Sequence, residues 1–307
     1  MTRGVVSTLA AFTMIGAPLT AQQRGNPPPV TGRSMVISRY GIVAASQPLA
    51  ARVGTDILEQ GGNAVDAAIA TNAAIGLMEP AMNGVGGDLF AMVYIAKEDK
   101  VYGLNASGWA PSGLTPALLA SKGITRMPST GIWPVTVPGA VGGWDALRTR
   151  FGTLPFSTLL APTIRYADAG FPVTQVIAAT WAQYLRKLTG DSNAAKTYLI
   201  NGHTPREGEI FRNPDLAKTL RLIAAKGREG FYTGPIADAI LATEHAKGGT
   251  MTAADLAELR PEWVTPLTTD YRGWTVYEMP PNSQGIGALM MLQMMAQFPI
   301  AQYGFQS

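Results

Sequence analysis

Residues 61–78 read Gly-Gly-Asn-Ala-Val-Asp-Ala-Ala-Ile-Ala-Thr-Asn-Ala-Ala-Ile-Gly-Leu-Met, and this stretch decides the architecture. The glycine pair follows residues 48–58, whose apolar side chains recur at helical spacing, and glycines favour the end of a helix. Asn63 is a residue type that caps helix N-termini, and residues 64–78 are apolar or small on almost every side. Helices of that kind are buried, so we predict a second helix here at the centre of a core.

Segments on both sides of these two helices have the short β-branched or aromatic pattern of strands. Residues 34–38 and 41–46 precede the helices, and residues 89–95 follow them. A polar turn at 97–100 separates residues 89–95 from residues 101–104. We therefore predict two short strands before the helices and a β-hairpin after them.

The remainder of the chain alternates helices with glycine and proline breaks. We predict a helical region across 144–188, with breaks at Gly152, Pro155 and Gly170. Further helices are predicted around 216–223 and 236–241, and across 253–259, where Thr252 is the N-cap. A strand at 275–279 and a helix across 286–298 follow. Composition shows no linker after residue 33. We predict that residues 34–307 form one continuous α/β unit with a helix-rich insertion.

Composition excludes several classes of protein. The chain has 307 residues, of which 47% are hydrophobic and 15% charged, enough to bury a sizeable core, so it is not disordered. A net charge of +3, spread evenly, is too small to indicate nucleic-acid binding. There is no Cys, which removes disulfides, thiolate metal sites and a Cys nucleophile, and two His residues are too few to favour a His-rich zinc site.

The first 33 residues have the pattern of a secretion signal and a spacer. Residues 1–21 place Arg3 ahead of an apolar run and end on small residues, as a cleavable signal peptide does. Residues 22–33 are polar and proline-rich, which predicts an extended leader. We therefore expect a secreted or periplasmic protein, with no segment long and apolar enough to span a membrane.

Three chemical alternatives each have an ordinary structural explanation. Residues 84–87 are glycine-rich like a nucleotide-binding loop, but a helix precedes them and a strand follows, the reverse of a dinucleotide fold. His203 and His245 have no Gly-x-Ser-x-Gly elbow to serve in a catalytic triad. The methionines within residues 290–295 have thioethers that suit copper, yet at helical spacing they favour core or interface packing.

A series of motifs in a fixed order resembles the large-subunit part of the gamma-glutamyltranspeptidase family, in the group with cephalosporin-acylase-like members. The matching stretches are Gly61–Ala68, Gly84–Phe90, Val137–Val141 with Trp144, Gly170–Val173, Gly230–Tyr232, Met251–Leu256 and Pro280–Gly285. Together they run from about residue 35 to about residue 298. Each motif alone is weak, and their common order carries the resemblance.

The resemblance implies an α/β (α+β) fold, the αββα sandwich of N-terminal-nucleophile hydrolases, of which this chain covers the large-subunit portion. It also implies a precursor that cuts itself and frees a Thr, whose hydroxyl attacks an acyl carbonyl while its α-amine acts as base. The one Thr-Thr pair, Thr268-Thr269, is followed by Asp270 instead of the family's His. We therefore expect no catalytic residue in this chain, which alone is inactive and incomplete, with the small subunit from the same precursor as its partner.

The resemblance also marks a substrate loop at residues 105–111, in which the family carries an arginine. Aligning Ala110-Pro111 with the family's Ala-Pro places the transpeptidase arginine at Ser107 and the acylase-group arginine at Trp109. Asn105, Ser107 and Trp109 are the substrate-binding residues that we predict. Loss of both arginines puts glutathione-type specificity in question, and Trp109 suits an apolar or aromatic acyl group.

Three functions stay open at this point. The first is the large-subunit part of a gamma-glutamyltransferase or glutathione hydrolase acting on gamma-glutamyl amides. The second is an acylase of the same fold that takes another acyl amide, and the third is an inactive remnant or binding protein. The resemblance implies a small-molecule substrate and no metal or organic cofactor. Without its partner, the chain is expected to expose sheet edges and the methionine-rich helix.

Overall fold

A computed structural model describes residues 35–304, and the predicted signal peptide (1–21) and leader (22–33) lie outside these residues. The chain divides into two units between Ser38 and Arg39, so the described residues fall into 35–38 and 39–304. In the first unit the described residues 35–38 contain no strand, so the strand predicted there is wrong for that part. All helices and strands of residues 35–304 belong to the second unit.

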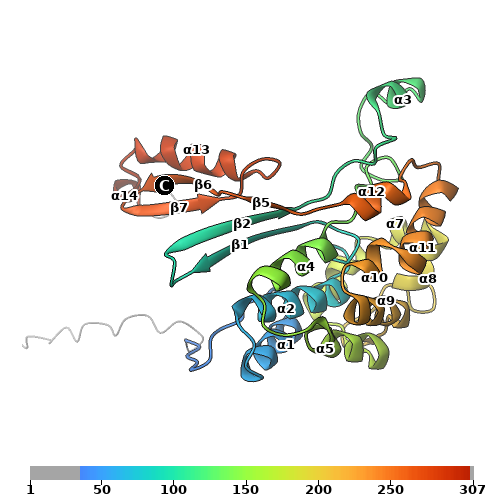
Figure 1. Ribbon diagram of the computed structural model, residues 1–307, viewed down its shortest axis with the longest axis horizontal. Helices are drawn as coiled ribbons and strands as arrows, with labels where there is room; N and C mark the ends of the chain where they lie inside the picture. Colours follow the sequence, from blue (N-terminus) through green and yellow to red (C-terminus); the bar gives the residue numbers. More distant parts are fainter. Residues whose placement is uncertain (1–34, 305–307) are drawn as a thin grey trace, which may run out of the picture. The chain divides into compact units, whose positions relative to one another are not determined.

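The two predicted helices are confirmed as α1 (Pro48–Glu59) and α2 (Ala64–Met78), and they pack against each other (Figure 1). The Asn63 side chain accepts hydrogen bonds from the backbone N–H groups of Val65 and Asp66, at 2.9 and 3.0 Å. The Asp66 carboxylate accepts in return from the Asn63 N–H, at 3.0 Å. This reciprocal capping box satisfies donors that the first helical turn leaves unpaired.

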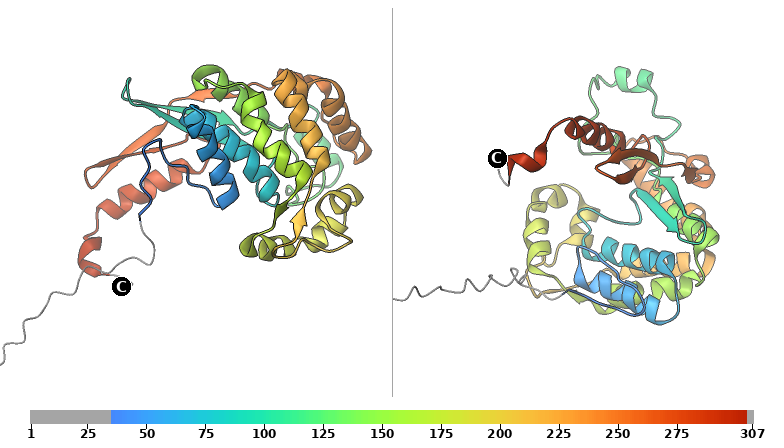
Figure 2. Two further views of the ribbon diagram at one scale, coloured as in Figure 1. Left: turned by 90° about the horizontal axis from the view of Figure 1, so that it is seen from below. Right: turned by 90° about the vertical axis from the view of Figure 1, so that its left-hand side faces the viewer.

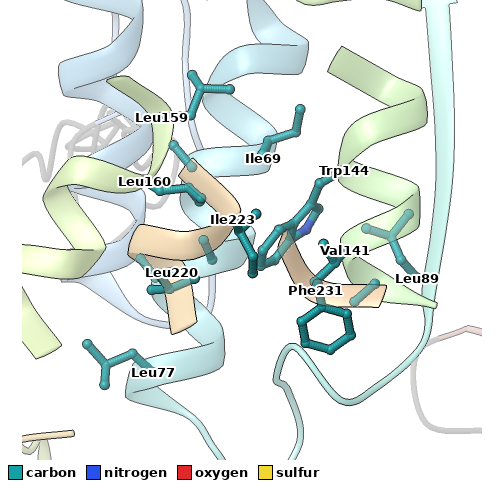
Figure 3. Packing of buried hydrophobic residues seen from close by; sticks show 14 of the residues in the cluster. Ile69, Leu77, Leu89, Val141, Trp144, Leu159, Leu160, Leu220, Ile223 and Phe231 are labelled. Atoms are coloured by element: carbon teal, nitrogen blue, oxygen red, sulfur yellow. The ribbon is translucent and has the colours of Figure 1, made fainter. Parts of the chain in front are cut away.

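α2 lies at the centre of the helical layer. It packs against α1, α4 (Ala140–Phe151) and α5 (Phe156–Ala169), and α5 packs in turn against α9 (Pro214–Lys226). Figure 3 shows part of the shared core, to which these five helices contribute buried side chains. Labelled members include Ile69, Leu77, Trp144, Leu159, Leu160, Leu220 and Ile223. Side chains on several sides of α2 are buried against neighbouring helices, which explains why its sequence is apolar nearly all round.

Asp66 also ties α2 to the loop between α4 and α5. Its carboxylate is fully buried and accepts from the backbone N–H groups of Thr153 and Leu154 and from the Thr153 hydroxyl, which lies 2.6 Å away. Asn63 makes a second tie, because its Nδ2 donates to the Phe151 carbonyl oxygen at 2.6 Å. The glycine-asparagine stretch that ends α1 thus also fixes the exit of α4.

An antiparallel sheet in the order β1-β2-β5 lies against α4, which contacts both β1 and β2 (Figure 1). The predicted hairpin is confirmed as β1 (Leu89–Ile95) and β2 (Lys100–Ala106), with Leu89 paired to Ala106. The third strand, β5 (Glu262–Val264), was not predicted. Its three residues are too few to show an alternating pattern.

A second hairpin, β6 (Leu267–Tyr271) and β7 (Trp274–Glu278), carries the helix α13 (Gly285–Ala296) on one side. β7 and α13 confirm the strand and the methionine-rich helix predicted for this region. The methionines of α13 are exposed, from 41% for Met295 to 58% for Met294. On β1 the alternate side chains Phe90, Met92 and Tyr94 are likewise 40% to 59% exposed. Two apolar faces therefore lie open to solvent.

The remaining elements complete the helical layer and its insertion, and Figure 2 shows them from two further sides. They are α3 (Pro116–Ser121), β3 (Phe171–Pro172), α6 (Gln175–Ala182), α7 (Leu185–Thr189), α8 (Ser192–Tyr198), β4 (Ile210–Phe211), α10 (Glu229–Tyr232), α11 (Gly234–Ala246), α12 (Ala253–Glu258) and α14 (Ile300–Tyr303). The predicted cap of α12 is confirmed, since Thr252 and Asp255 form a capping box. α3 lies out on a long loop and has no buried residue.

The strand predicted at residues 41–46 is wrong. These residues have no strand hydrogen bonds, and Ile42 is 64% exposed. β-branched side chains favour extended backbone, but a strand forms only where a neighbour accepts and donates along it. In residues 35–304 no segment lies in that position.

Tyr232 joins the helical layer to the loop before α4. Its hydroxyl donates to the Pro138 carbonyl oxygen at 2.6 Å and accepts from the Gly142 N–H at 2.9 Å. The side chain is 1% exposed, and this burial raises the pKa of Tyr232 to about 12. The folded protein therefore favours the protonated phenol, which the hydrogen bond to Pro138 requires, although the bond from the Gly142 N–H partly offsets this rise in pKa.

Replacing Tyr232 with Phe is expected to lower the free energy of unfolding by about 1–3 kcal/mol at pH 8, because two buried partners lose their bond. The pKa is near 10 in the unfolded chain, so stability from the neutral phenol is complete below pH 10 and is lost as the pH rises through 12. The free energy of unfolding of the wild type should therefore approach that of the variant by about 2 kcal/mol between pH 9 and pH 12. Urea unfolding of both proteins at several pH values measures this change. A stability difference that does not vary with pH would contradict the raised pKa of Tyr232.

Candidate substrate site

The predicted substrate loop begins at the last residues of β2. Asn105 lies opposite Phe90 of β1 and Glu262 of β5 in the sheet, so its position is fixed by strands on both sides. Its side-chain oxygen accepts from the Ser107 N–H at 3.0 Å, which turns the chain away from the sheet. Asn105 thereby sets the direction in which Ser107 and Trp109 leave the strand.

Backbone contacts hold the loop in place. Gly108 has a φ of +76°, a region that glycine adopts without strain, and an added Cβ there would lie 1.9 Å from the Val137 carbonyl oxygen. The Val137 N–H donates to the Trp109 carbonyl oxygen at 2.9 Å. Residues 105–109 therefore run directly against the Val137–Val141 motif, and no side chain fits between the two backbones.

Asn282 meets this loop from a distant part of the sequence. Its Oδ1 accepts from Asn105 Nδ2 at 2.9 Å, and its Nδ2 donates to the Ser107 Oγ at 3.0 Å. Asn282 lies in the Pro280–Gly285 motif between β7 and α13. The sequence marked that motif but did not mark Asn282 as a site residue. The sequence feature that could have indicated Asn282 is its place as a polar residue directly after two prolines in that loop.

A pocket of about 190 Å³ opens where these segments meet, and it brings the three predicted residues together. Trp109 is 40% exposed and lines this pocket, so it is not a residue of the hydrophobic core. The other lining residues are Ala106, Gly108, Leu259, Arg260, Pro261, Glu262 and Asn282. Arg260, which follows α12, and Glu262, the first residue of β5, were not predicted, because neither lies in a motif and both are about 150 residues further along the chain.

The candidate nucleophiles and bases weighed above have structural contacts instead. Thr269 lies in β6, is 7% exposed, and accepts from the side chain of Gln293 at 3.0 Å. His203 Nδ1 lies 2.9 Å from the Thr204 carbonyl oxygen, and His245 Nε2 lies 2.8 Å from that of Met251. Both histidines thus contact backbone carbonyl groups, and within residues 35–304 neither forms the hydrogen bond to a hydroxyl that a triad requires.

Within residues 35–304 no three His, Asp or Glu side chains are grouped as a metal ion would need. Each helix there is also too short or too polar to cross a lipid bilayer.

Comparison with known proteins identifies the family. The model of the family described as gamma-glutamyltranspeptidase matches residues 50–307. The chain belongs to this family. Its fold is accordingly the mixed α and β fold of the N-terminal-nucleophile hydrolases, which confirms the predicted fold class.

Relatives of this family member include both hydrolases and an acylase. A glutathione hydrolase proenzyme from Bacillus subtilis is 35% identical over 88% of this chain, and the match covers 47% of that protein. The crystal structure of Helicobacter pylori gamma-glutamyltranspeptidase has a TM-score of 0.84 at 30% identity, covering 89% of this chain and 80% of that one. For cephalosporin acylase from Bacillus halodurans the TM-score is 0.83 at 44% identity, covering 89% and 52%. The chain spans about half the length of the curated relatives it matches.

Proposed function

We propose that this chain is the large-subunit part of a secreted, self-processing enzyme of the gamma-glutamyltransferase and glutathione hydrolase type. It would cleave gamma-glutamyl amides with an N-terminal Thr nucleophile that lies beyond these 307 residues. The observation that carries the proposal is the pocket in which Asn105, Ser107 and Asn282 form one hydrogen-bonded group beside Trp109. Relatives named as glutathione hydrolase proenzymes support the reaction class.

The chemistry would be divided between the two parts of the precursor. The hydroxyl of the Thr attacks the acyl carbonyl while its α-amine takes the proton. The C–N bond of the amide then breaks, the leaving amine carries that proton away, and the acyl group remains on the Thr. Water or an acceptor amine releases it. The residues of this chain would bind and orient the acyl group.

The exposed apolar faces support a partner from the same precursor. Phe90, Met92 and Tyr94 on β1 and the methionines of α13 are open to solvent in residues 35–304. Apolar side chains gathered in this way usually mark a surface that another chain covers. A small subunit, produced when the precursor cuts itself, is the occupant that the family resemblance implies. Secretion or a periplasmic location rests on the pattern of residues 1–21.

A second candidate is an acylase of the same fold with a non-glutamyl acyl substrate. Ser107 and Trp109 stand where the resemblance expects arginines, and Trp109 presents an apolar ring to the pocket. The similarity to cephalosporin acylase, at 44% identity, favours this candidate too. The third candidate is an inactive remnant or a binding protein. It applies if no small subunit with a functional Thr nucleophile is produced.

A substrate panel on the whole precursor, expressed from its full reading frame, tests these candidates. We expect the p-nitroanilide of gamma-glutamate to be cleaved at least about tenfold faster, by kcat/KM, than that of phenylacetic acid. The reverse order, with KM for the phenylacetyl compound raised by Trp109→Ala, would overturn the glutamyl proposal in favour of the acylase. Cleavage of neither compound by a folded, processed protein would overturn both.

A further inference from the structure

The pocket contains one arginine that the sequence motifs do not mark. Arg260 follows α12 and lines the pocket together with Asn105, Ser107 and Trp109. It lies more than 150 residues from that loop in the sequence, and the pairing of β5 with β2 brings it there. We propose that Arg260 binds a carboxylate group of the acyl substrate in this pocket.

The hydrogen bonds of Arg260 leave it free for a ligand. In residues 35–304 both of its hydrogen bonds come from Nη1, to the carbonyl oxygens of Ala257 and Leu259 at 2.7 and 2.8 Å. The guanidinium forms no ion pair with an acidic side chain within those residues, so Nε and Nη2 keep their donors. A planar guanidinium with two free donors on one edge matches the two oxygens of a carboxylate.

Arg260 is not needed to hold the end of α12. Nη2 of Arg228 donates to the same two carbonyl oxygens, those of Ala257 and Leu259, at 2.8 and 2.6 Å. The Arg228 side chain is 13% exposed, whereas Arg260 is exposed. The less exposed arginine, Arg228, therefore caps the helix, whereas Arg260 repeats these bonds and differs from Arg228 by lining the pocket.

Among the polar residues that line the pocket, Arg260 is the one with a positive charge that can bind an anion. Asn105, Ser107 and Asn282 bond to one another and form a neutral wall. Glu262, the one acidic residue of the lining, would repel an anion and so opposes binding of a second carboxylate. The pocket volume of about 190 Å³ is small for a ligand pocket, which usually spans ~300–1,000 Å³. The site therefore suits a short acyl chain that carries a single carboxylate.

The assignment of this carboxylate to an acyl substrate rests on the proposed function, and a binding measurement separates the two. Glutaramate, which has one carboxylate and one amide, and the neutral glutaramide are titrated into the chain by ligand-observed NMR. Arg260→Gln should weaken glutaramate binding by about tenfold or more and leave glutaramide binding within about twofold. Arg260→Lys should fall between the two, because it keeps the charge and loses the fork.

Matched variants complete the test. Glu262→Gln should strengthen glutaramate binding several-fold, and Arg126→Gln, which removes the same charge outside the pocket, should change nothing. Arg260→Gln should keep the wild-type melting temperature, since Arg228 retains both carbonyl bonds. Unchanged glutaramate binding in Arg260→Gln, or an equal loss of both ligands, would overturn the proposal. If the whole precursor cleaves no acyl amide while Arg260-dependent binding persists, the proposed function fails and the anion site stands.

Discussion

Replacing Asp66 with Ala is expected to lower the free energy of unfolding by about 3–5 kcal/mol, because a fully buried carboxylate with several donors would disappear. The N–H groups of Asn63, Thr153 and Leu154 and the Thr153 hydroxyl all donate to it. Hydrogen bonds to charged groups are the stronger ones, and each buried donor left without a partner adds a desolvation penalty. Chemical denaturation of the purified chain measures the loss.

Asp215→Ala is the matched control for this prediction. Asp215 also lies in the first turn of a helix, α9, but it is 74% exposed and pairs with Lys218 on the surface. Removing it should cost less than about 1 kcal/mol, since only a screened ion pair and the helix-end charge are lost. Equal losses for the two variants would contradict a special role for the buried network and leave only the helix-end effect.

Replacing Gly108 with Ala is expected to destabilise the protein by about 3 kcal/mol and to displace the substrate loop. The left-handed backbone at φ +76° costs about 1–2 kcal/mol for a residue with a Cβ. The Cβ would also lie 1.9 Å from the Val137 carbonyl oxygen, an overlap worth about 1–3 kcal/mol even after relaxation. Because Val137 N–H bonds to the Trp109 carbonyl, the relaxation should move Trp109 and lower affinity for the substrate.

Gly123→Ala isolates the backbone contribution. Gly123 has a similar φ of +68°, at the end of α3, but nothing lies within 4 Å of its added Cβ. Its loss of stability should be about 1 kcal/mol, with ligand binding unchanged. If Gly108→Ala were no worse than Gly123→Ala, the close backbone approach between residues 108 and 137 would not hold the site together.

The features that could be predicted from sequence are those encoded by neighbouring residues. Asn63 and Thr252 were identified as caps because the groups that they bond lie two or three residues away. The α2 helix was placed at the centre of the core from its own composition. The hairpin of β1 and β2 was visible because its turn is local.

The features that were missed depend on partners elsewhere in the chain. Residues 41–46 look like a strand by composition, but a strand needs a neighbour that residues 35–304 do not supply. The resemblance predicted Asn105, Ser107 and Trp109 as substrate-binding residues, and all three line one pocket. Asn282 and Arg260 reach that site through the folding of β5 and of the loop before α13, which no local pattern encodes.

We propose that this chain is part of a precursor whose nucleophile lies beyond Ser307, and the genomic DNA past that codon tests this proposal most directly. We expect the open reading frame to continue and to reach a Thr-Thr-His-like processing site, from which a small subunit would begin. A stop codon directly after Ser307, with no small-subunit frame downstream, would contradict this proposal and leave a binding protein or remnant without its own nucleophile.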